Sequence, residues 1–423
     1  MQILIVGGGG REHALGWKLK QSQKVSKIFF APGNGGTDEI GENVSLDLTD
    51  HKSLCAWVKK NSVDFVVIGP DNYLAEGMAD SLLSKGIKVF GATKAASKIE
   101  WSKSFAKELM EEEGIPTAKF RKFSDISVAQ KYIDGQKFPL VIKADGLALG
   151  KGVIIAKTKK EAETALKEIM SDKTFGDAGN TVVIEEYLVG EEISIHAFCD
   201  GKNFALFPTS QDHKRIYENE EGPNTGGMGT IAPVPWVKQD VIKEIQEKIL
   251  IPIIRALDER ECPFKGIIYP GIMITRDGPK VIEFNARFGD PETQSYMRLL
   301  QSDLLEIMVA CAEGTLAHTD IKWSKDSACT VVLASRGYPG KYDKNIEIKG
   351  IEKFSKSEDI VIFHAGTKKD GDKILTSGGR VLGITAVTDS LDGALRKAYK
   401  AIKEIQFDGV QFRRDIGQKS LKK

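Results

Sequence analysis

A short alternating stretch, residues 281–292, carries the residue types that metal and phosphate chemistry uses. Its polar positions are Glu283, Asn285 and Arg287, and its apolar positions are Ile282, Phe284, Ala286 and Phe288. Read as a strand, the stretch places the polar side chains on one face and the apolar ones on the core face. Hard cations take oxygen ligands and a guanidinium pairs with phosphoryl oxygens, so the polar face predicts a metal and phosphate site. A solvated edge strand with a surface ion pair is the alternative.

A second candidate site is the glycine-rich run at 145–152, which lies between two apolar stretches that read as strands, 139–144 and 153–156. A Walker A loop must lead into a helix and end in Gly-Lys-Ser or Gly-Lys-Thr, so this run is a different kind of loop. It predicts a hairpin flap over phosphate, with Lys143 behind the loop and Lys151 at its tip. A plain glycine hairpin with solvated lysines explains the pattern equally well.

Two further stretches have the chemistry of a nucleotide site. Residues 181–194 read as a strand, a short linker and another strand, and an extended linker offers backbone groups to an adenine edge while a following carboxylate takes ribose hydroxyls. Residues 211–235 are long, polar and glycine-rich, which is more typical of an active-site lid than of a plain connection. The Asp, Lys and Arg side chains of that segment also fit ordinary surface charge.

The elements that position these residues begin with an N-terminal alternation of strands and helices. Strands are predicted at 2–6, 27–31, 64–69 and 87–90, which indicates a doubly wound sheet with ligands at the carboxyl ends of its strands. The glycine run 7–10 lacks the spacing of a dinucleotide fingerprint, and no acidic residue ends the second strand. NAD binding is therefore disfavoured, and a helix N-terminus suited to phosphate remains.

The rest of the chain divides into three parts. A helix at 94–113 carries Lys103, and a smaller domain is expected to start near Pro116. A helix to about residue 260, strands at 266–274 and 279–288, and helices to about 314 follow. The last hundred residues are predicted to form a separate α+β unit with strands near 328–335, 359–365 and 381–387. Its glycine corner at 377–380 is a turn and a candidate anion site.

Composition restricts the partners and the compartment. The chain has 423 residues and a net charge of +1, which gives no case for nucleic-acid or membrane-surface binding. Its five cysteines show no CxxC spacing, and its six histidines show no zinc-site pairing. The apolar opening is too short for a signal-peptide core or a membrane span. These features predict a cytoplasmic protein without a disulfide framework or a zinc site.

Taken in order, these stretches resemble the phosphoribosylamine-glycine ligase family of ATP-grasp enzymes, and the resemblance runs essentially end to end. The QDHKR, GPNTGGMG and EFNARFGDPE runs together are the specific signal. The family-like stretches are residues 7–15, 31–34, 143–147, 211–215, 222–229, 283–292 and 377–380. One departure follows the strand at 64–69, where the chain has Gly-Pro-Asp-Asn-Tyr-Leu instead of the usual Gly-Pro-Glu-x-Pro-Leu, and Leu149 replaces a commoner alanine.

The resemblance implies an α/β and α+β multidomain fold in which ATP lies between the flap and central domains. The expected parts are an N-terminal Rossmann-like doubly wound domain at 1–100, a helical linker and small flap domain at 101–190, a central ATP-grasp domain at 191–325 and a small C-terminal α+β domain at 326–423. A monomer or weak oligomer is expected.

The resemblance also implies a role for each candidate residue. Glu283 and Asn285 would bind Mg²⁺ or Mn²⁺. The expected ATP contacts are Lys103, Lys143, Gly146, Lys151, Glu185, Glu186, Leu188 and Glu192. The expected substrate contacts are Gly9, Gly10, Arg11, Asn34, Asp71, Asp212, Arg287, Gly379 and Arg380. The expected catalytic residues are Arg287, Lys143, Asp212 and Lys214.

The implied reaction ligates glycine to 5-phosphoribosylamine with ATP, through glycyl phosphate, in de novo purine biosynthesis. Asp71 follows the strand at 64–69, where an open sheet binds its ligand, and is expected to accept hydrogen bonds from the ribose hydroxyls. A turn-forming Asp after Gly69 and Pro70 is the alternative. Another ATP-grasp carboxylate-amine ligase is the alternative.

Overall fold

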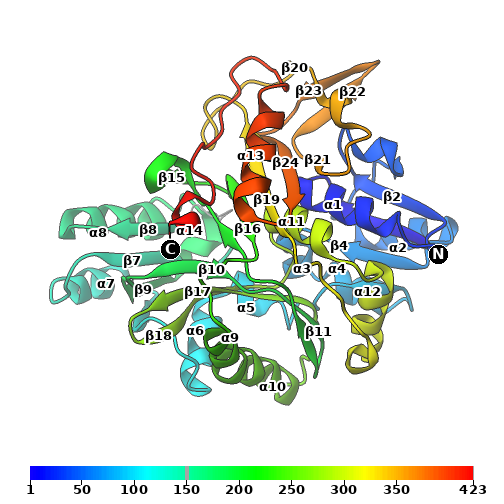
Figure 1. Cartoon of the computed structure of the whole chain (residues 1–423). Helices are drawn as coiled ribbons and strands as arrows, with labels where there is room; N and C mark the ends of the chain where they lie inside the picture. The colour runs from blue at the N-terminus through cyan, green and yellow to red at the C-terminus, as the bar shows by residue number, and fades with distance from the viewer. Residues whose placement is uncertain (148–151, 423) are drawn as a thin grey trace.

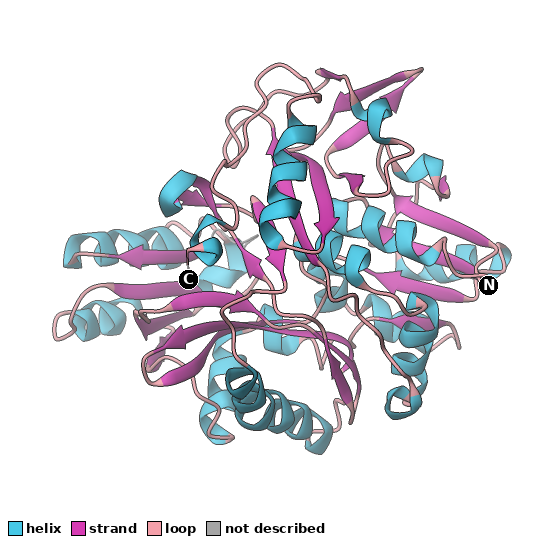
Figure 2. Cartoon of the chain, viewed as in Figure 1, coloured by secondary structure: helices cyan, strands magenta, loops and turns pink. Residues whose placement is uncertain are grey.

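The computed structural model describes residues 1–147 and 152–422, so Leu149 and Lys151 of the flap lie outside the described residues. Figure 1 shows four main β-sheets around the middle of the molecule: the N-terminal sheet at the right, a small sheet at the left, a central sheet below and a C-terminal sheet at the top. Figure 2 shows that many of the helices lie on the outside of these sheets. No helix among the described residues is long and apolar enough to cross a membrane.

The N-terminal sheet is parallel and has the strand order β3-β2-β1-β4-β5. Its central strand is fully buried from Ile3 to Val6, which explains why it reads as a continuous apolar run. The strand order reverses beside β1, so a crevice is expected at the carboxyl ends of β1 and β4. The elements are β1 (Gln2–Gly7), α1 (Gly10–Leu19), β2 (Lys27–Pro32), β3 (Glu42–Asn43), α2 (His51–Lys60), β4 (Phe65–Ile68), α3 (Asp71–Glu76), α4 (Met78–Leu83) and β5 (Lys88–Phe90).

Two helices, α5 (Lys98–Trp101) and α6 (Lys103–Glu112), lead into a small antiparallel sheet with the order β6-β9-β7-β8. Its strands are β6 (Phe120–Phe123), β7 (Leu140–Ala144), β8 (Val153–Ala156) and β9 (Val182–Glu186), and its helices are α7 (Ile126–Ile133) and α8 (Lys159–Leu166). Its buried apolar residues form their own cluster, between Phe123 and Ile184. The small sheet is therefore a separately packed body.

The central sheet has the order β10-β17-β11-β12, with β18 on the other side of β17. Its strands are β10 (Glu191–Ser194), β11 (Ala197–Asp200), β12 (Phe204–Leu206), β17 (Lys265–Thr275) and β18 (Gly278–Asn285). The associated helices are α9 (Gln239–Ile245), α10 (Ile251–Glu259), α11 (Glu292–Leu299) and α12 (Leu304–Glu313). One apolar cluster joins this sheet to the N-terminal one, since it contains Leu4 of β1 and Phe284 of β18.

The prediction for the strand at 279–288 is wrong in two respects. The strand ends at Asn285, so Arg287 lies beyond it. A bulge lies opposite the Gly271–Ile272 step of β17, where Glu283 pairs with Gly271 and Val281 with Ile272. A bulge breaks the alternation, so Val281 is fully buried while Ile282 is only partly buried. Phe284, the next apolar position, keeps its predicted place in the core.

The C-terminal sheet has the order β13-β16-β19-β24-β21, and it corrects two expectations. The predicted loop at 211–235 largely forms strands, and two of them, β13 (Gln211–Asp212) and β16 (Gly229–Ala232), join this sheet. The C-terminal unit is therefore not separate. The remaining elements are β14 (Arg215–Tyr217), β15 (Glu221–Asn224), β19 (Ser327–Ala334), β20 (Glu347–Ile348), β21 (Ile360–His364), β22 (Thr367–Asp370), β23 (Lys373–Thr376), β24 (Arg380–Thr388), α13 (Leu391–Ile402) and α14 (Gln418–Leu421).

Candidate functional site

Glu283 lies on β18 at the centre of a group of cations. Lys214 Nζ is 3.7 Å from its Oε1. Burial raises the pKa of this carboxyl, but the charges of Lys214, Lys143, Lys103 and Arg287 outweigh burial and lower the pKa below its usual value. The carboxylate therefore stays ionised. Lys214, Lys143 and Arg287 also pair with Glu192, Glu185 and Glu100. Among these four cations Lys103 is therefore the one without an ion pair in the described part of the chain, and its charge suits a polyphosphate.

Arg287 is held by a carboxylate that sequence reasoning missed. Its Nε lies 3.2 Å from Glu100 Oε1, and the other oxygen of Glu100 accepts a hydrogen bond from Ala286 N at 2.8 Å. Burial raises the pKa of Glu100 to about 7, although Arg287 lowers it. Glu100 lies in the short helix α5 with no recognisable motif around it, so nothing in the sequence marks it.

The predicted metal ligands fit a cation that is shared with phosphate. Asn285 Oδ1 accepts a hydrogen bond from Arg287 at 3.3 Å and its Nδ2 donates to Tyr269 O at 3.3 Å, so the amide is oriented with its oxygen toward the charged groups. Within the described part of the chain, no cluster of three or more His, Cys, Asp or Glu could hold a metal. Mg²⁺ typically uses one or two carboxylates together with substrate phosphates, so one carboxylate and one amide oxygen match that requirement.

The lysines behind the flap are tied to buried partners. Lys143 Nζ lies 2.9 Å from Glu185 Oε1 and donates to Ile282 O at 2.9 Å. Lys107 lies 2.9 Å from the other oxygen of Glu185. Lys103 donates to Gly146 O at 2.9 Å, and burial lowers its pKa. These lysines line a narrow cavity of about 20 Å³ together with Glu100, Glu185, Glu283 and apolar side chains.

Of the predicted adenine and ribose contacts, Glu185 lines this cavity. Glu185 is a buried member of β9, whereas Glu186 is at the strand end and accepts a hydrogen bond from Lys119 N at 3.0 Å. Leu188 follows in the linker between β9 and β10, which is not regular structure. Glu192 on β10 pairs with Lys214, so a lysine from the 211–235 segment reaches the predicted ribose site.

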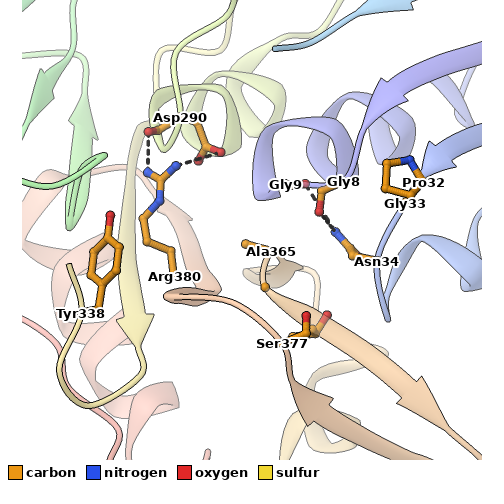
Figure 3. Close-up of a pocket in the computed structure, with 12 residues that line it drawn as sticks. Gly8, Gly9, Pro32, Gly33, Asn34, Asp290, Tyr338, Ala365, Ser377 and Arg380 are labelled. Carbon is orange, nitrogen blue, oxygen red and sulfur yellow. Dashed lines mark hydrogen bonds and ion pairs between the residues drawn. The ribbon is translucent and has the colours of Figure 1, made fainter. Parts of the chain in front are cut away.

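A second and larger cavity, of about 350 Å³, opens between the N-terminal and C-terminal parts (Figure 3). Glycine loops form one wall, because Asn34 Nδ2 donates to Gly8 O at 3.0 Å and to His364 O at 2.8 Å. A side chain at Gly8 would lie 2.4 Å from the carbonyl oxygen of Gly33, so only glycine permits this approach. The lining residues are Gly8, Gly9, Pro32, Gly33, Asn34, Asp290, Tyr338, Ala365, Gly366, Thr367, Ser377 and Arg380.

Arg380 works as a clamp at the edge of this cavity. Its guanidinium donates to Asp290 O at 2.6 Å and lies 3.2 Å from the Asp290 carboxylate (Figure 3). It also donates to Gly226 O at 2.6 Å. Gln294 Nε2 donates to Asp290 Oδ1 at 2.8 Å. The clamp joins the GPNTGGMG run, the end of the EFNARFGDPE run and β24, which are far apart in sequence.

The structure separates the predicted substrate residues. Gly9, Asn34 and Arg380 line the large cavity. The others lie outside its lining: Gly10, Arg11, Asp71, Asp212, Arg287 and Gly379. Arg11 is buried against Glu12 and Phe288 O, and the charge of Asp71 acts on Glu100 and Arg287. The turn at 365–367 and Tyr338 were missed, because no local pattern marks them as part of a site, whereas Ser377 belongs to the glycine corner at 377–380 that the sequence offers as a candidate anion site.

Asp212 lies in a buried acidic environment between the two sites. Burial raises the pKa of Asp212 well above its usual value, and Glu292 raises it further, while Lys214 and Arg380 lower it. Glu292 accepts hydrogen bonds from Tyr269 Oη at 2.7 Å and Ser194 Oγ at 3.1 Å. Asp212 therefore retains its proton to a higher pH than an ordinary carboxyl group and can donate a hydrogen bond.

The fold and site together define an ATP-grasp enzyme, in which a lysine-bearing antiparallel sheet faces the carboxylate and amide of a central strand. The chain belongs to the phosphoribosylglycinamide synthetase family. Family models match its N domain at residues 1–100, its ATP-grasp (A) domain at 101–293 and its C domain at 328–419. The predicted family, fold class and ligase class are confirmed, and as an ATP-grasp ligase the chain uses ATP.

Relatives cover the whole chain. A phosphoribosylamine–glycine ligase of Caldanaerobacter subterraneus subsp. tengcongensis is 46% identical over 416 residues, 98% of this chain and 99% of that protein. The human trifunctional purine biosynthetic protein adenosine-3 is 46% identical over 424 residues, which are 99% of this chain but 42% of that protein. The crystal structure of a Thermotoga maritima phosphoribosylamine–glycine ligase, 33% identical, superposes with a TM-score of 0.87 over 98% of this chain and all of that one. The biotin carboxylase domain of a Hydrogenobacter thermophilus carboxylase shares the fold. It is 14% identical to this chain and superposes with a TM-score of 0.74 over 97% of this chain and 91% of that one.

Proposed function

We propose that this ligase joins glycine to 5-phosphoribosylamine with ATP, giving glycinamide ribonucleotide, ADP and phosphate in purine biosynthesis. The observation that carries the proposal is the path of residues 283–290. This one segment supplies Glu283 to the cationic cluster and Asp290 to the large cavity. A phosphoryl donor at one end and a sugar amine at the other therefore meet along a single stretch of backbone.

The chemistry requires activation of a carboxylate. The carboxylate oxygen of glycine attacks the γ-phosphorus of ATP, forming a P–O bond as the bond to ADP breaks. The amine then attacks the acyl carbon of glycyl phosphate, and the C–O bond breaks to release phosphate. Neither step needs a protein nucleophile, so the chain contributes positioning and charge neutralisation.

Each charged residue has a proposed part in this reaction. Arg287, fixed by Glu100, faces the charge that develops on the transferring phosphoryl group. Lys143 and Lys103 contact the polyphosphate, and Lys214 lies between Glu192 and Glu283, where the nucleotide sugar and phosphates would meet. Glu283 and Asn285 would hold Mg²⁺ or Mn²⁺, which supplies further neutralisation of phosphoryl charge when bound.

The large cavity is the proposed site of the sugar amine. Its volume of about 350 Å³ is within the range of small-molecule pockets. Its walls combine glycine backbone with the hydroxyls of Thr367 and Ser377 and the carboxylate of Asp290, which are partners for ribose hydroxyls and for an amine.

A coupled ADP-release assay tests the proposal by omitting each substrate in turn. We expect ADP release only when ATP, glycine and 5-phosphoribosylamine are all present, together with a divalent cation. Equal release with another carboxylate or another amine would assign the chain to a different ATP-grasp reaction, the alternative noted from the sequence.

We also propose a cytoplasmic location and a monomeric or weakly associating state. All five cysteines are unpaired and four of them are buried, which suits a reducing compartment. Fractionation of cells tests the location. Light scattering at several protein concentrations tests the association, and a concentration-independent dimer mass would contradict it.

A further inference from the structure

The histidine of the glycine-rich run at residues 7–15 has no part in the proposed mechanism. His13 lies near the start of α1 and is buried. Its Nδ1 accepts a hydrogen bond from the backbone N of His364 at 2.8 Å. His364 is the last residue of β21, so this bond joins the N-terminal helix directly to the C-terminal sheet.

The bond satisfies a backbone group that the sheet itself leaves open. β21 is the last strand in the order of the C-terminal sheet, and N–H groups on an outer edge have no neighbouring strand to accept them. Burial, together with the neighbouring His364, lowers the pKa of His13 to about 3, so the ring is neutral and carries its proton on Nε2. An apolar side chain at position 13 would leave the buried N–H without this acceptor, so packing alone does not account for a histidine here.

The turn at 365–367, which lines the large cavity, follows directly after the peptide that His13 holds. His364 Nδ1 lies 3.1 Å from Thr367 Oγ1 within this segment. Thr367 is in turn bonded to the opposite wall, because Gly35 N lies 3.2 Å from Thr367 Oγ1 and 3.1 Å from Thr367 O. The turn and the glycine loop therefore meet beside the two histidines, at one end of the cavity.

The loop at 33–36 packs on the same two histidines. Asn34 Nδ2 donates to His364 O at 2.8 Å, so side chains from the N-terminal part hold both backbone groups of His364. Gly36 lies so close that a Cβ there would be 2.6 Å from Cε1 of His13 and 2.6 Å from Cγ of His364. A shift of the His364 peptide would therefore change the separation of the two cavity walls.

We propose that His13 is a positioning residue for the sugar-amine site and acts through the turn at 365–367. Its Nδ1 fixes the His364 peptide and so holds the turn against the loop at 33–36. Without this acceptor the buried N–H must find another partner, and the turn moves away from that loop. The sugar amine then loses contacts, whereas the polyphosphate cluster around Glu283 is unaffected. This inference rests on the proposed function in placing the sugar amine in the large cavity.

Calorimetric binding of glycinamide ribonucleotide and of MgADP tests this role without turnover. His13→Leu removes the acceptor and should weaken glycinamide ribonucleotide binding about tenfold, while MgADP affinity stays the same. His13→Asn places its Oδ1 near the position of Nδ1 and should restore most of the affinity. His13→Gln carries the same amide one methylene further, so it should bind as weakly as His13→Leu. The Asn and Gln variants decide the question if His13→Leu does not fold.

His51→Leu is the matched control. His51 Nδ1 lies 3.0 Å from Ser81 Oγ, which joins α2 to α4 within the N-terminal part and outside the cavity lining. This variant should leave both affinities unchanged.

Wild-type affinity for glycinamide ribonucleotide in His13→Leu or His13→Gln would overturn the proposal. Equal losses in His13→Asn and His13→Gln, or equal losses of both ligands, would show a merely structural role and also overturn it. A wild-type protein that binds MgADP but not glycinamide ribonucleotide would contradict the proposed function, and this inference with it.

Discussion

The two sites differ in how their charges are balanced before any ligand binds. Around Glu283, three of the four neighbouring cations pair with a further carboxylate, and Lys103 forms no ion pair with any described residue. Around the large cavity the charges are matched, because Arg380 pairs with Asp290, and the Asn34 amide is used by backbone groups. One site is electrostatically incomplete and the other is already assembled.

This difference indicates how each site recognises its ligand. A polyphosphate completes this cluster, because its negative charge supplies the partner that Lys103 lacks among the described residues. The assembled cavity selects by shape and by hydrogen bonds from fixed backbone. Packing follows the same division, because the small sheet that carries Lys143 has its own core, while the N-terminal and central sheets share one. The polyphosphate site thus lies where a separately packed body meets the rest.

Removing the one central carboxylate should have the largest effect. We expect Glu283→Gln to lower the rate of ADP release by about a hundred- to a thousandfold, because the variant loses a metal ligand and the charge that orients the neighbouring cations. Asn285→Ala should act in the same direction. Both variants should melt near the wild-type temperature. Asp277→Asn, at the exposed turn between β17 and β18, is the control and should leave the rate of ADP release unchanged. Near-normal turnover at low metal concentration would contradict the metal assignment.

Glu100 makes the stability of the cluster pH-dependent. Its pKa in the folded protein is about 7, mainly because of burial, and is above its value in the unfolded chain. The protonated form is therefore favoured by folding, so its contribution is complete below about pH 4.5 and is lost as pH rises to about 7. We expect this to remove about 3 kcal/mol of unfolding free energy over that range.

Urea unfolding at pH 4.5, 6 and 7.5 measures this effect. Glu100→Gln cannot titrate, so its stability should fall less than that of the wild type over the same range. Parallel pH profiles for the two proteins would show that Glu100 is ionised throughout.

Removal of the cation Lys143 is a second test of the polyphosphate site. We expect Lys143→Met to raise the KM for ATP about ten- to a hundredfold, because a charge-assisted contact to phosphate disappears. The KM values for glycine and the sugar amine should stay the same. Glu185 keeps Lys107 as a partner, so the fold should persist. Lys157→Met, on the exposed end of the same small sheet, is the control. An unchanged KM for ATP would make Lys143 a purely structural residue.

A substitution in the large cavity should have the opposite effect to Lys143→Met, because it should change the KM for the sugar amine and not the KM for ATP. Asp290→Asn keeps the shape of the side chain but removes the charge that faces Arg380. We expect about a tenfold increase in the KM for 5-phosphoribosylamine, with the KM for ATP unchanged. A larger change for ATP than for the sugar amine would remove the distinction between the two sites.

Replacement of Asp71 should have the smallest effect on the KM values, and the pattern of the changes distinguishes two positions for this side chain. Sequence pattern places it at the sugar, which predicts a change confined to the KM for 5-phosphoribosylamine. Its position outside the cavity lining, with its charge acting on Glu100 and Arg287, predicts instead that Asp71→Ala raises all KM values by only about threefold. A tenfold or larger increase for the sugar amine alone would favour the role expected from the sequence.

Much of the molecule is determined by local pattern. The apolar run of β1, the glycine turn after it and the alternation of strands and helices predict the doubly wound sheet, because buried parallel strands and helix starts have distinctive compositions. The period of two along residues 283–285 and Lys143 at the end of a strand likewise predict the polyphosphate cluster, since each residue is marked by its own neighbours.

Tertiary structure decided what depends on contacts between distant segments. The bulge beside Ile282 depends on pairing with β17, and β16 joins the C-terminal sheet because β19 provides an edge for it. Glu100 and Lys107 are charged helix residues that no sequence motif marks, and their ion-pair partners lie far along the chain or in a sheet. The large cavity is closed by a turn at 365–367 against loops near residues 8 and 34. No local sequence pattern predicts these contacts between distant segments, because they depend on how separate elements pack.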